Sequence, residues 1–344
     1  MKSAYLSGVQ KIELREVAAP ACPVDGLILT VKACGICGSD LRRWKEGPGE
    51  ELVVGGHEVA GVVEAVGSMV KGYSVGDRLA LAPDVHCGKC YFCQHGQFNL
   101  CDQLNLIGIT PGYDGGLTEK MVLTAEILER GIVHHIPSGL DFADAALAEP
   151  CSSVLSAHDH AGTDLGHTVL VMGGGPIGCL HMAVARARGA QVILSEPSKV
   201  RQEIAKEFQP VAIIDPLRED LQARIREITN GVGVDIVVCA NPIAATQTQA
   251  VEVVRKGGRV VLFGGLPKAN PITSLDGNRI HYGEIEVVGS FSYHPTYHQM
   301  ALDVIHRGLI PADKFITHRF ALDQINDAFE AASSGEALKV IITF

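Results

Sequence analysis

The chain contains 344 residues, of which 47% are hydrophobic and 20% are charged. This length predicts two domains, each large enough to bury a core, and the composition excludes a largely disordered chain. Lysine and arginine together number 29 against 39 acidic residues, so the formal net charge is -10. Because nucleic-acid-binding proteins present basic surfaces, this balance argues against a nucleic-acid partner and leaves small molecules open.

Membrane and secretory signals are weak throughout the chain. No apolar run approaches the roughly 20 residues of a membrane-spanning helix, and residues 1–6 lead into polar and charged positions rather than a signal peptide. Four of the ten cysteines fall between positions 87 and 101, which favours a metal site over a disulfide scaffold. We therefore expect a cytoplasmic protein with no membrane partner.

The first 150 residues are rich in predicted strands. Apolar runs at 27–33 and 59–66 are typical of β-strands, and glycines punctuate this half at short intervals. Many short strands joined by glycine-containing turns predict a barrel-like fold.

Beyond Glu149-Pro150 the pattern changes to alternating strands and helices, which indicates βαβ units and a parallel sheet. The segment 291–344 adds two predicted helices, 295–307 and 322–333, and a closing strand, 339–342. The fold class is therefore α/β, a doubly wound Rossmann sheet together with a β-rich, barrel-like catalytic domain. In the alternating region, strands are predicted at 168–172, 192–194, 211–214, 235–238, 259–263 and 285–290, and helices at 177–188 and 199–208.

A glycine-rich loop follows the first strand of the alternating region. Gly173, Gly175 and Gly178 form the pattern G-x-G-x-x-G, with Pro176 and Ile177 between the last two. The three glycines allow a tight turn, close approach of a pyrophosphate to the backbone, and close packing of the helix on the sheet. The free N–H groups at the helix start favour the anion, so these five residues are expected to bind a dinucleotide.

An acidic residue, Glu196, ends the next predicted strand, 18 positions after Gly178. A carboxylate there accepts hydrogen bonds from the adenosine ribose and repels the additional phosphate of NADP. Lys199 and Arg201 lie close enough to assist a phosphate, and Arg201 is counted among the expected cofactor-binding residues. NAD is therefore the expected cofactor, with NADP the less favoured alternative.

The spacing Cys87-x2-Cys90-x2-Cys93-x7-Cys101 is the strongest single signal in the chain. Four thiolates at these intervals can surround one ion tetrahedrally, and an all-cysteine shell leaves no position for substrate, so the expected site is a structural zinc. An iron–sulfur cluster and four unrelated buried cysteines are the alternatives.

A second constellation combines Cys34 and Cys37, which follow a predicted strand, with His57 and Glu58 about 20 residues later. Cys34-x-x-Cys37 alone fits a redox pair, but that motif is expected beside a βαβ unit, and this one lies in the β-rich half. Cys37, His57 and an acidic third ligand would instead form an open zinc site, with one position left for water or substrate.

Taken together, these motifs resemble the zinc-dependent medium-chain dehydrogenases, in particular their polyol (sorbitol-type) branch. The resemblance runs over essentially the whole chain. It implies that Cys37, His57 and Glu58 surround a catalytic zinc, with Glu149 as a further ligand, direct or through water. The motifs that carry it are 34–40, 55–58, 87–101, 114–116, 149–150 and 173–178.

The resemblance also implies a domain order and an assembly. The catalytic zinc-binding domain would comprise 1–150 and a return segment, 291–344, on either side of a dinucleotide-binding domain at 151–290. Two zinc ions per chain and a homodimer or homotetramer follow from the family. Ethanol-type members carry a cysteine where this chain has Glu149, and many members have a histidine of a proton relay where it has Arg42. Because an arginine stays protonated, the proton must leave by another route.

The expected chemistry is oxidation of a secondary alcohol in a polyol or cyclitol. A zinc ion acts as a Lewis acid on the substrate hydroxyl, Ser39 is placed to accept its proton, and the hydride passes to the nicotinamide. The alternatives are a sugar-phosphate or sugar-acid dehydrogenase, a threonine 3-dehydrogenase-like enzyme, and a non-catalytic protein that binds nucleotide and zinc.

Three further features bear on the substrate. The basic run 42–45 fits recognition of an acidic substrate, or else a solvated face balanced by Glu46, Glu50 and Glu51. Trp44 is interpreted as a wall of the substrate cleft. Lys339 is interpreted as reaching the cofactor pyrophosphate or as a surface lysine.

Overall fold

The computed structural model describes residues 1–49 and 52–344, and the chain divides into two compact units. The first unit combines Met1–Ser152 with Tyr293–Phe344, and the second is Ser153–Ser292. The first division falls inside one helix, α5 (Ala148–His160). Across the described residues, no helix is both long enough and apolar enough to cross a membrane.

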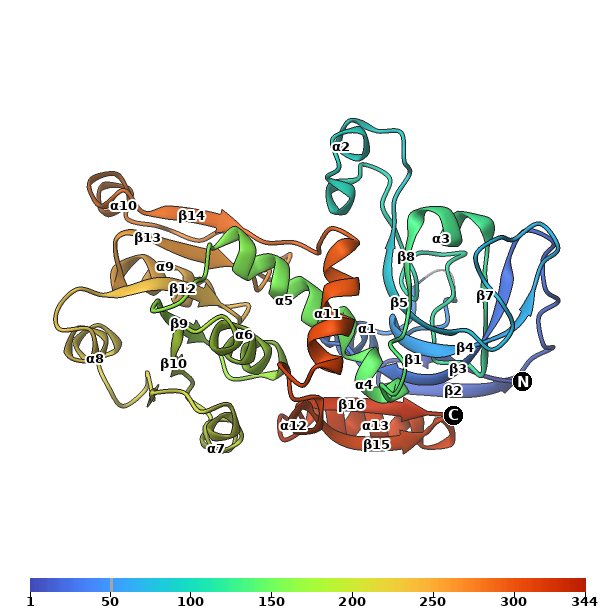
Figure 1. The fold of residues 1–344 in the computed structure, drawn as a ribbon. Helices are drawn as coiled ribbons and strands as arrows, with labels where there is room; N and C mark the ends of the chain where they lie inside the picture. The colour runs from blue at the N-terminus through green and yellow to red at the C-terminus, as the bar shows by residue number, and fades with distance from the viewer. Residues whose placement is uncertain (50–51) are drawn as a thin grey trace. The chain divides into compact units, whose positions relative to one another are not determined.

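Six parallel strands form the sheet of the second unit (Figure 1). Their order is β11-β10-β9-β12-β13-β14, so the chain adds strands first on one side of β9 and then on the other. This order is the doubly wound 3-2-1-4-5-6 arrangement, and its switch point lies between β9 and β12. The strands are β9 (Thr168–Met172), β10 (Gln191–Ser195), β11 (Ala212–Ile214), β12 (Val234–Cys239), β13 (Val254–Leu262) and β14 (Glu286–Gly289).

Helices cover this sheet, with α6 packed on β9 and β10 and α9 packed on β12 and β13. Leu170, Ile193, Val237 and Val260 have no exposed surface, which is the near-continuous apolar character of strands covered on both faces. The helices of this unit after α5 are α6 (Pro176–Ala187), α7 (Lys199–Ala205), α8 (Leu221–Ile228), α9 (Ala244–Val253) and α10 (Gly277–Gly283), with a short 3-10 turn at Lys206–Phe208.

An eight-stranded sheet dominates the first unit. One side of β3 pairs with β4, whereas on the other side its first half pairs with β7 and its end with β16. Apart from β15 and β16, which run parallel, the paired strands are antiparallel, and β1 and β2 form a separate hairpin. The strands are β1 (Lys2–Gly8), β2 (Lys11–Glu16), β3 (Leu27–Gly35), β4 (Glu58–Val66), β5 (Arg78–Val85), β6 (Asn105–Leu106), β7 (Lys120–Leu123), β8 (Gly131–His135), β15 (Ile316–Ala321) and β16 (Lys339–Thr343).

Short helices complete the first unit. The core between them and the sheet includes Leu29, Leu79 and Phe329, and it also contains Trp44. The helices are α1 (Gly38–Glu46), α2 (Tyr91–Gln94), α3 (Ala125–Arg130), α4 (Phe142–Ala146), α11 (Thr296–His306), α12 (Ala312–Phe315) and α13 (Ile325–Ser333), with 3-10 turns at Phe98–Leu100 and Leu322–Gln324.

The predicted fold class is confirmed, and two local expectations are wrong. The strand expected at 259–263 begins earlier, at Val254, because it continues through Gly257 in a left-handed conformation (φ +66°) with a shift of register against β12. Trp44 does not wall a cleft. Its side chain is 5% exposed and packs against Phe329, with ring centroids 5.9 Å apart, so it is a core residue.

Candidate metal and dinucleotide sites

Three side chains with metal-binding atoms converge where β3 ends and β4 begins. A sulfur of Cys37, a ring nitrogen of His57 and a carboxylate oxygen of Glu58 all lie within 4.8 Å of one another. Cys37 precedes α1, while Glu58 opens β4 and pairs with Gly35 at the end of β3. Strand pairing therefore brings together residues that are about 20 positions apart in the chain.

His57 carries the most direct indication that this group suits a cation. The side chain is 4% exposed, its Nδ1 has no hydrogen-bond partner, and the nearest Asp40 oxygen is 3.8 Å away. Burial lowers the pKa of His57, but the charges of Asp40 and Cys37 outweigh burial and raise that pKa well above 6.5. The surroundings of His57 thus favour positive charge at a buried position. Zinc binds the donor types found here, which are cysteine sulfur, imidazole nitrogen and carboxylate oxygen.

The remaining predicted residues of this site lie beside that group. Ser39 Oγ is 3.4 Å from His57 Nε2. Glu149, in the first turn of α5, is outside the 4.8 Å group, and its Oε1 accepts a hydrogen bond of 3.2 Å from the Tyr293 hydroxyl. Burial raises the pKa of Glu149 to about 7. Tyr293, which is 2% exposed, was not anticipated from the sequence.

Lys339 is a second residue whose position was not anticipated. It opens β16, is 5% exposed, and its Nζ donates to both carboxylate oxygens of Glu58, at 2.6 and 2.8 Å. Burial lowers the pKa of Lys339, but the charges of Glu58 and Cys37 outweigh burial and raise it. The expectation of a surface lysine is wrong, and its amine is engaged by Glu58. No local pattern signals a contact between residues 281 positions apart.

The four clustered cysteines also meet in space. The sulfurs of Cys87, Cys90, Cys93 and Cys101 lie within 4.8 Å of one another, and none is in a disulfide. Sulfur pairs are separated by 3.5, 3.9 and 4.0 Å, whereas a tetrahedral zinc with ligands at about 2.3 Å requires about 3.8 Å. Backbone N–H groups of Cys87 and Gln103 donate to the Cys101 sulfur. This geometry suits four thiolates around one ion.

The glycine loop joins β9 to α6. Gly173 adopts φ +112°, which a side chain disfavours, and a Cβ on Gly178 would overlap the Gly173 carbonyl oxygen. Gly175 precedes the first helical residue, and nothing lies within 4 Å of a Cβ placed on it. The backbone at Gly175 is therefore open to an approaching anion at the start of α6, which fits a pyrophosphate.

Glu196 follows β10 beside this loop. Its two carboxylate oxygens accept hydrogen bonds from the backbone N–H groups of Gly174, at 2.6 Å, and Ser198, at 2.8 Å. Lys199 forms a salt bridge with Asp215, with its Nζ 3.0 Å from a carboxylate oxygen. Arg201 lies half-buried on α7. Of the two cations expected to assist a phosphate, one is thus already paired with a carboxylate.

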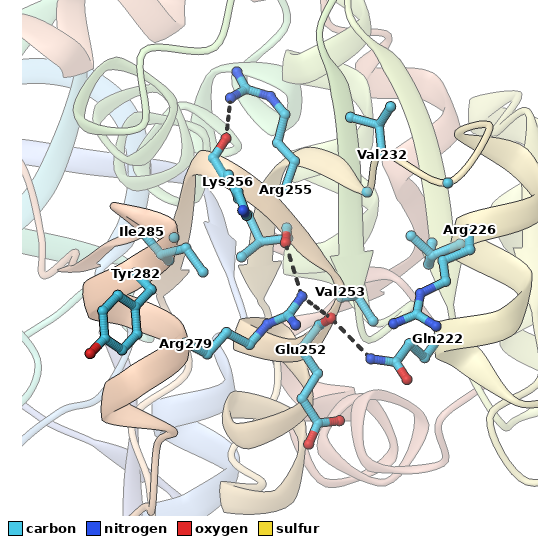
Figure 2. A pocket seen from close by; sticks show the side chains of 15 residues that line it. Gln222, Arg226, Val232, Glu252, Val253, Arg255, Lys256, Arg279, Tyr282 and Ile285 are labelled. Atoms are coloured by element: carbon cyan, nitrogen blue, oxygen red, sulfur yellow. Dashed lines mark hydrogen bonds between the residues drawn. The ribbon is translucent and has the colours of Figure 1, made fainter.

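A separate pocket of about 270 Å³ lies in the second unit (Figure 2). It is lined near Val254 and Gly233, at the amino ends of β13 and β12, whereas the glycine loop follows the carboxyl end of β9. In a parallel sheet these are opposite edges, so this pocket is not the dinucleotide site. Arg279 donates to the carbonyl oxygen of Glu252 near the end of α9, as Figure 2 shows. It also donates to the carbonyl oxygen of Val251.

The basic run 42–45 lies within α1, and the helix directs its side chains into different environments. Arg43 donates to the Gly108 carbonyl oxygen at 2.5 Å, and Trp44 is buried, so only Arg42 and Lys45 are exposed. Glu46 is exposed beside them, while Glu50 and Glu51 lie outside the described residues. The arrangement favours a partly solvated helix face over a continuous cationic patch.

Two family models match the chain. The model described as alcohol dehydrogenase GroES-like domain matches residues 24–137, and the model described as zinc-binding dehydrogenase matches residues 176–307. A sorbitol dehydrogenase of Bacillus subtilis (strain 168) is 34% identical over 99% of this chain and 97% of its own length. A D-xylulose reductase A of Aspergillus oryzae is 31% identical, covering 99% of this chain and 96% of its own.

A solved structure also matches this chain over its full length. A zinc-binding dehydrogenase from Sinorhizobium meliloti 1021, bound to NADP, superposes with a TM-score of 0.90 at 33% identity. The match covers 100% of this chain and 99% of that one, so both units are included.

Proposed function

Because the chain belongs to the zinc-dependent medium-chain dehydrogenases, in their polyol dehydrogenase branch, we propose that it oxidises a secondary alcohol of a polyol or cyclitol and transfers hydride to a nicotinamide cofactor. The chain is an NAD(P)-dependent, zinc-containing alcohol dehydrogenase. The observation that carries the assignment of the site is the convergence of Cys37, His57 and Glu58 donor atoms within 4.8 Å.

The first unit is proposed as the catalytic domain. Cys37 and His57 would hold the catalytic zinc, with Glu58 and Glu149 as acidic partners, and the four clustered cysteines would hold a structural zinc. A zinc ion at the first of these sites supplies a Lewis acid that lowers the pKa of an alcohol hydroxyl. Ser39, whose hydroxyl lies beside His57 and is partly exposed, would accept this proton while releasing its own to water. Arg42 is exposed and stays protonated, so the proton does not pass through it.

The second unit is proposed as the dinucleotide-binding domain. Gly173, Gly175 and Gly178, with Pro176 and Ile177, would bind the pyrophosphate at the start of α6, and Glu196 the adenosine ribose. Each oxygen of that carboxylate accepts one backbone hydrogen bond and retains a lone pair for a ribose hydroxyl. Its negative charge and the pairing of Lys199 with Asp215 favour NAD, although the similar Sinorhizobium meliloti dehydrogenase is bound to NADP.

Two wider features complete the proposal. We place the enzyme in the cytoplasm, since all ten of its cysteines are free and thiolate metal sites persist in a reducing compartment. A homodimer or homotetramer is the proposed assembly, and the mass of the purified protein in solution, measured by light scattering, tests it.

The activity is tested by following reduced nicotinamide with NAD and NADP in parallel. The substrate panel contains polyols, cyclitols, sugar acids, sugar phosphates and threonine, and zinc content is measured on the same preparation. We expect polyol or cyclitol oxidation, two zinc ions per chain, and loss of activity with a zinc chelator. A response confined to sugar phosphates, sugar acids or threonine would replace the substrate assignment. One zinc ion and no activity would favour a non-catalytic protein.

A further inference from the structure

Glu58 and Lys339 form a buried ion pair in which the lysine ammonium has three hydrogen-bond acceptors. An ammonium has three donors, and those of Lys339 reach both oxygens of Glu58 and, at 3.3 Å, the carbonyl oxygen of Ile36. Glu58 has no exposed surface. A buried carboxylate held by a cation at both oxygens is fixed in position and has part of its charge already compensated.

The fold builds a specific place for this pair. β3 lies between β4, which opens with Glu58, and β16, which opens with Lys339, so the lysine side chain reaches past the end of β3 to the carboxylate. At that end stands Gly35, where a Cβ would overlap the Glu58 carboxylate. The missing side chain leaves room for the ion pair within reach of Cys37 and His57.

The other acidic residue of the site is held in a different way. Within the described residues 1–49 and 52–344, Glu149 accepts one side-chain hydrogen bond, from the phenol of Tyr293. A metal ion that recruits Glu149 competes with one neutral donor, whereas a metal ion that recruits Glu58 competes with an ammonium bound at both oxygens. The ammonium also repels a divalent cation at the neighbouring thiolate.

We propose that Lys339 is a positioning residue that keeps Glu58 a weak, displaceable partner of the catalytic zinc, so that one coordination position stays open to the substrate hydroxyl. This inference rests on the proposed function, because it concerns the same zinc site. Without Lys339 the freed carboxylate would bind the zinc firmly. The rate of zinc loss from the site should therefore decrease, and turnover should fall. A lysine that merely shaped the site would, when removed, let the metal escape faster.

The test measures loss of zinc from the holoenzyme into excess dipicolinate, followed with a zinc-sensitive dye. The phase that belongs to the catalytic site is identified as the one missing in Cys37→Ser. For Lys339→Met we expect this phase to slow on the order of tenfold, a size common for changes around metal ligands, and kcat to fall. For Glu58→Gln we expect faster zinc loss, because the buried Lys339 ammonium is then left without its carboxylate and repels the divalent cation.

Controls separate the local effect from a general one. Lys120→Met removes another lysine of the same unit that pairs with a glutamate, Glu64, and should leave the phase unchanged. In the double variant Lys339→Met/Glu58→Gln the slowing should disappear, since it requires the carboxylate.

Faster or unchanged zinc loss in Lys339→Met overturns the inference. If this variant fails to fold, Lys339→Gln, which also removes the charge, is measured in its place and the same outcomes decide. If the wild-type enzyme lacks the phase altogether, the proposed function fails, and the inference with it.

Discussion

Cys37 is the single sulfur donor of the proposed catalytic set. We expect Cys37→Ser to lose one of two zinc ions and to lower kcat about a thousandfold or more, because the Lewis acid is absent. Dinucleotide binding should be retained, since the glycine loop belongs to the other unit. Zinc analysis, steady-state kinetics and quenching of protein fluorescence by NADH measure these effects, with Cys22→Ser as control. Full zinc content and normal turnover would refute the assignment.

Glu196 makes two separable contributions, a charge and two hydrogen-bond acceptors. Glu196→Gln retains an acceptor for Gly174 or Ser198 but loses the charge that repels a phosphate. We expect the preference of kcat/KM for NAD over NADP to fall roughly tenfold, about 1.4 kcal/mol. Glu203→Gln, an exposed change on α7, the helix that follows Glu196, is the matched control. An unchanged ratio would mean that another residue reads the ribose.

At the start of α6, two glycines have different roles: Gly178 allows close packing, and Gly175 leaves the backbone open to a ligand. A Cβ on Gly178 would overlap the Gly173 carbonyl, whereas a Cβ on Gly175 meets nothing within 4 Å. Gly178→Ala should therefore lower the free energy of unfolding by about 2 kcal/mol or more, because helix and loop must separate. Gly175→Ala should change stability by less than about 1 kcal/mol yet weaken NAD binding about tenfold, since the methyl group occupies the path of the pyrophosphate.

Urea unfolding and NAD titration of both glycine variants test this contrast. Equal losses of stability in the two variants would contradict the distinction between a packing glycine and a binding glycine. The three-glycine pattern would then act only as a flexible loop.

At the scale of the whole molecule, buried histidines make stability depend on pH. His158, His181 and His298 have no exposed surface. Burial lowers the pKa of His158 and of His298 to about 3, and that of His181 well below 6.5. Because their folded pKa values lie below the unfolded value near 6.5, the stability they allow is complete above pH 6.5 and is lost as the pH falls toward 3. Each contributes a slope of up to about 1.4 kcal/mol per pH unit.

Acid also protonates thiolates, so the contribution of one histidine is isolated by substitution. We expect His158→Gln to show a shallower fall in the free energy of unfolding between pH 6.5 and 5 than the wild type, by about 1 kcal/mol per pH unit. Urea unfolding at three pH values measures the difference. Parallel curves would show that His158 is protonated equally in the folded and unfolded states.

The sequence alone identified the parts of this protein that are coded by short spacings. The glycine loop and the four cysteines each occupy one short segment, because a tight turn and a tetrahedral ion impose local spacing. The strand–helix alternation is longer, but each of its units is recognisable from its own residues. The fold class followed from them, and β9 begins and ends at the predicted residues. The family resemblance also required the motifs 34–40, 55–58, 114–116 and 149–150.

Tertiary structure alone decided what surrounds the catalytic residues. Lys339 meets Glu58 across 281 positions and Tyr293 meets Glu149 across 144, and neither contact leaves a periodic trace in the chain. Trp44 follows Cys37 closely in the chain, a position that predicts a cleft wall, yet α1 packs against α13 and the Trp44 side chain lies in the core. Such contacts depend on which distant strands pair and on how side chains fill the space between elements. Because both depend on residues throughout the chain, no short segment predicts them.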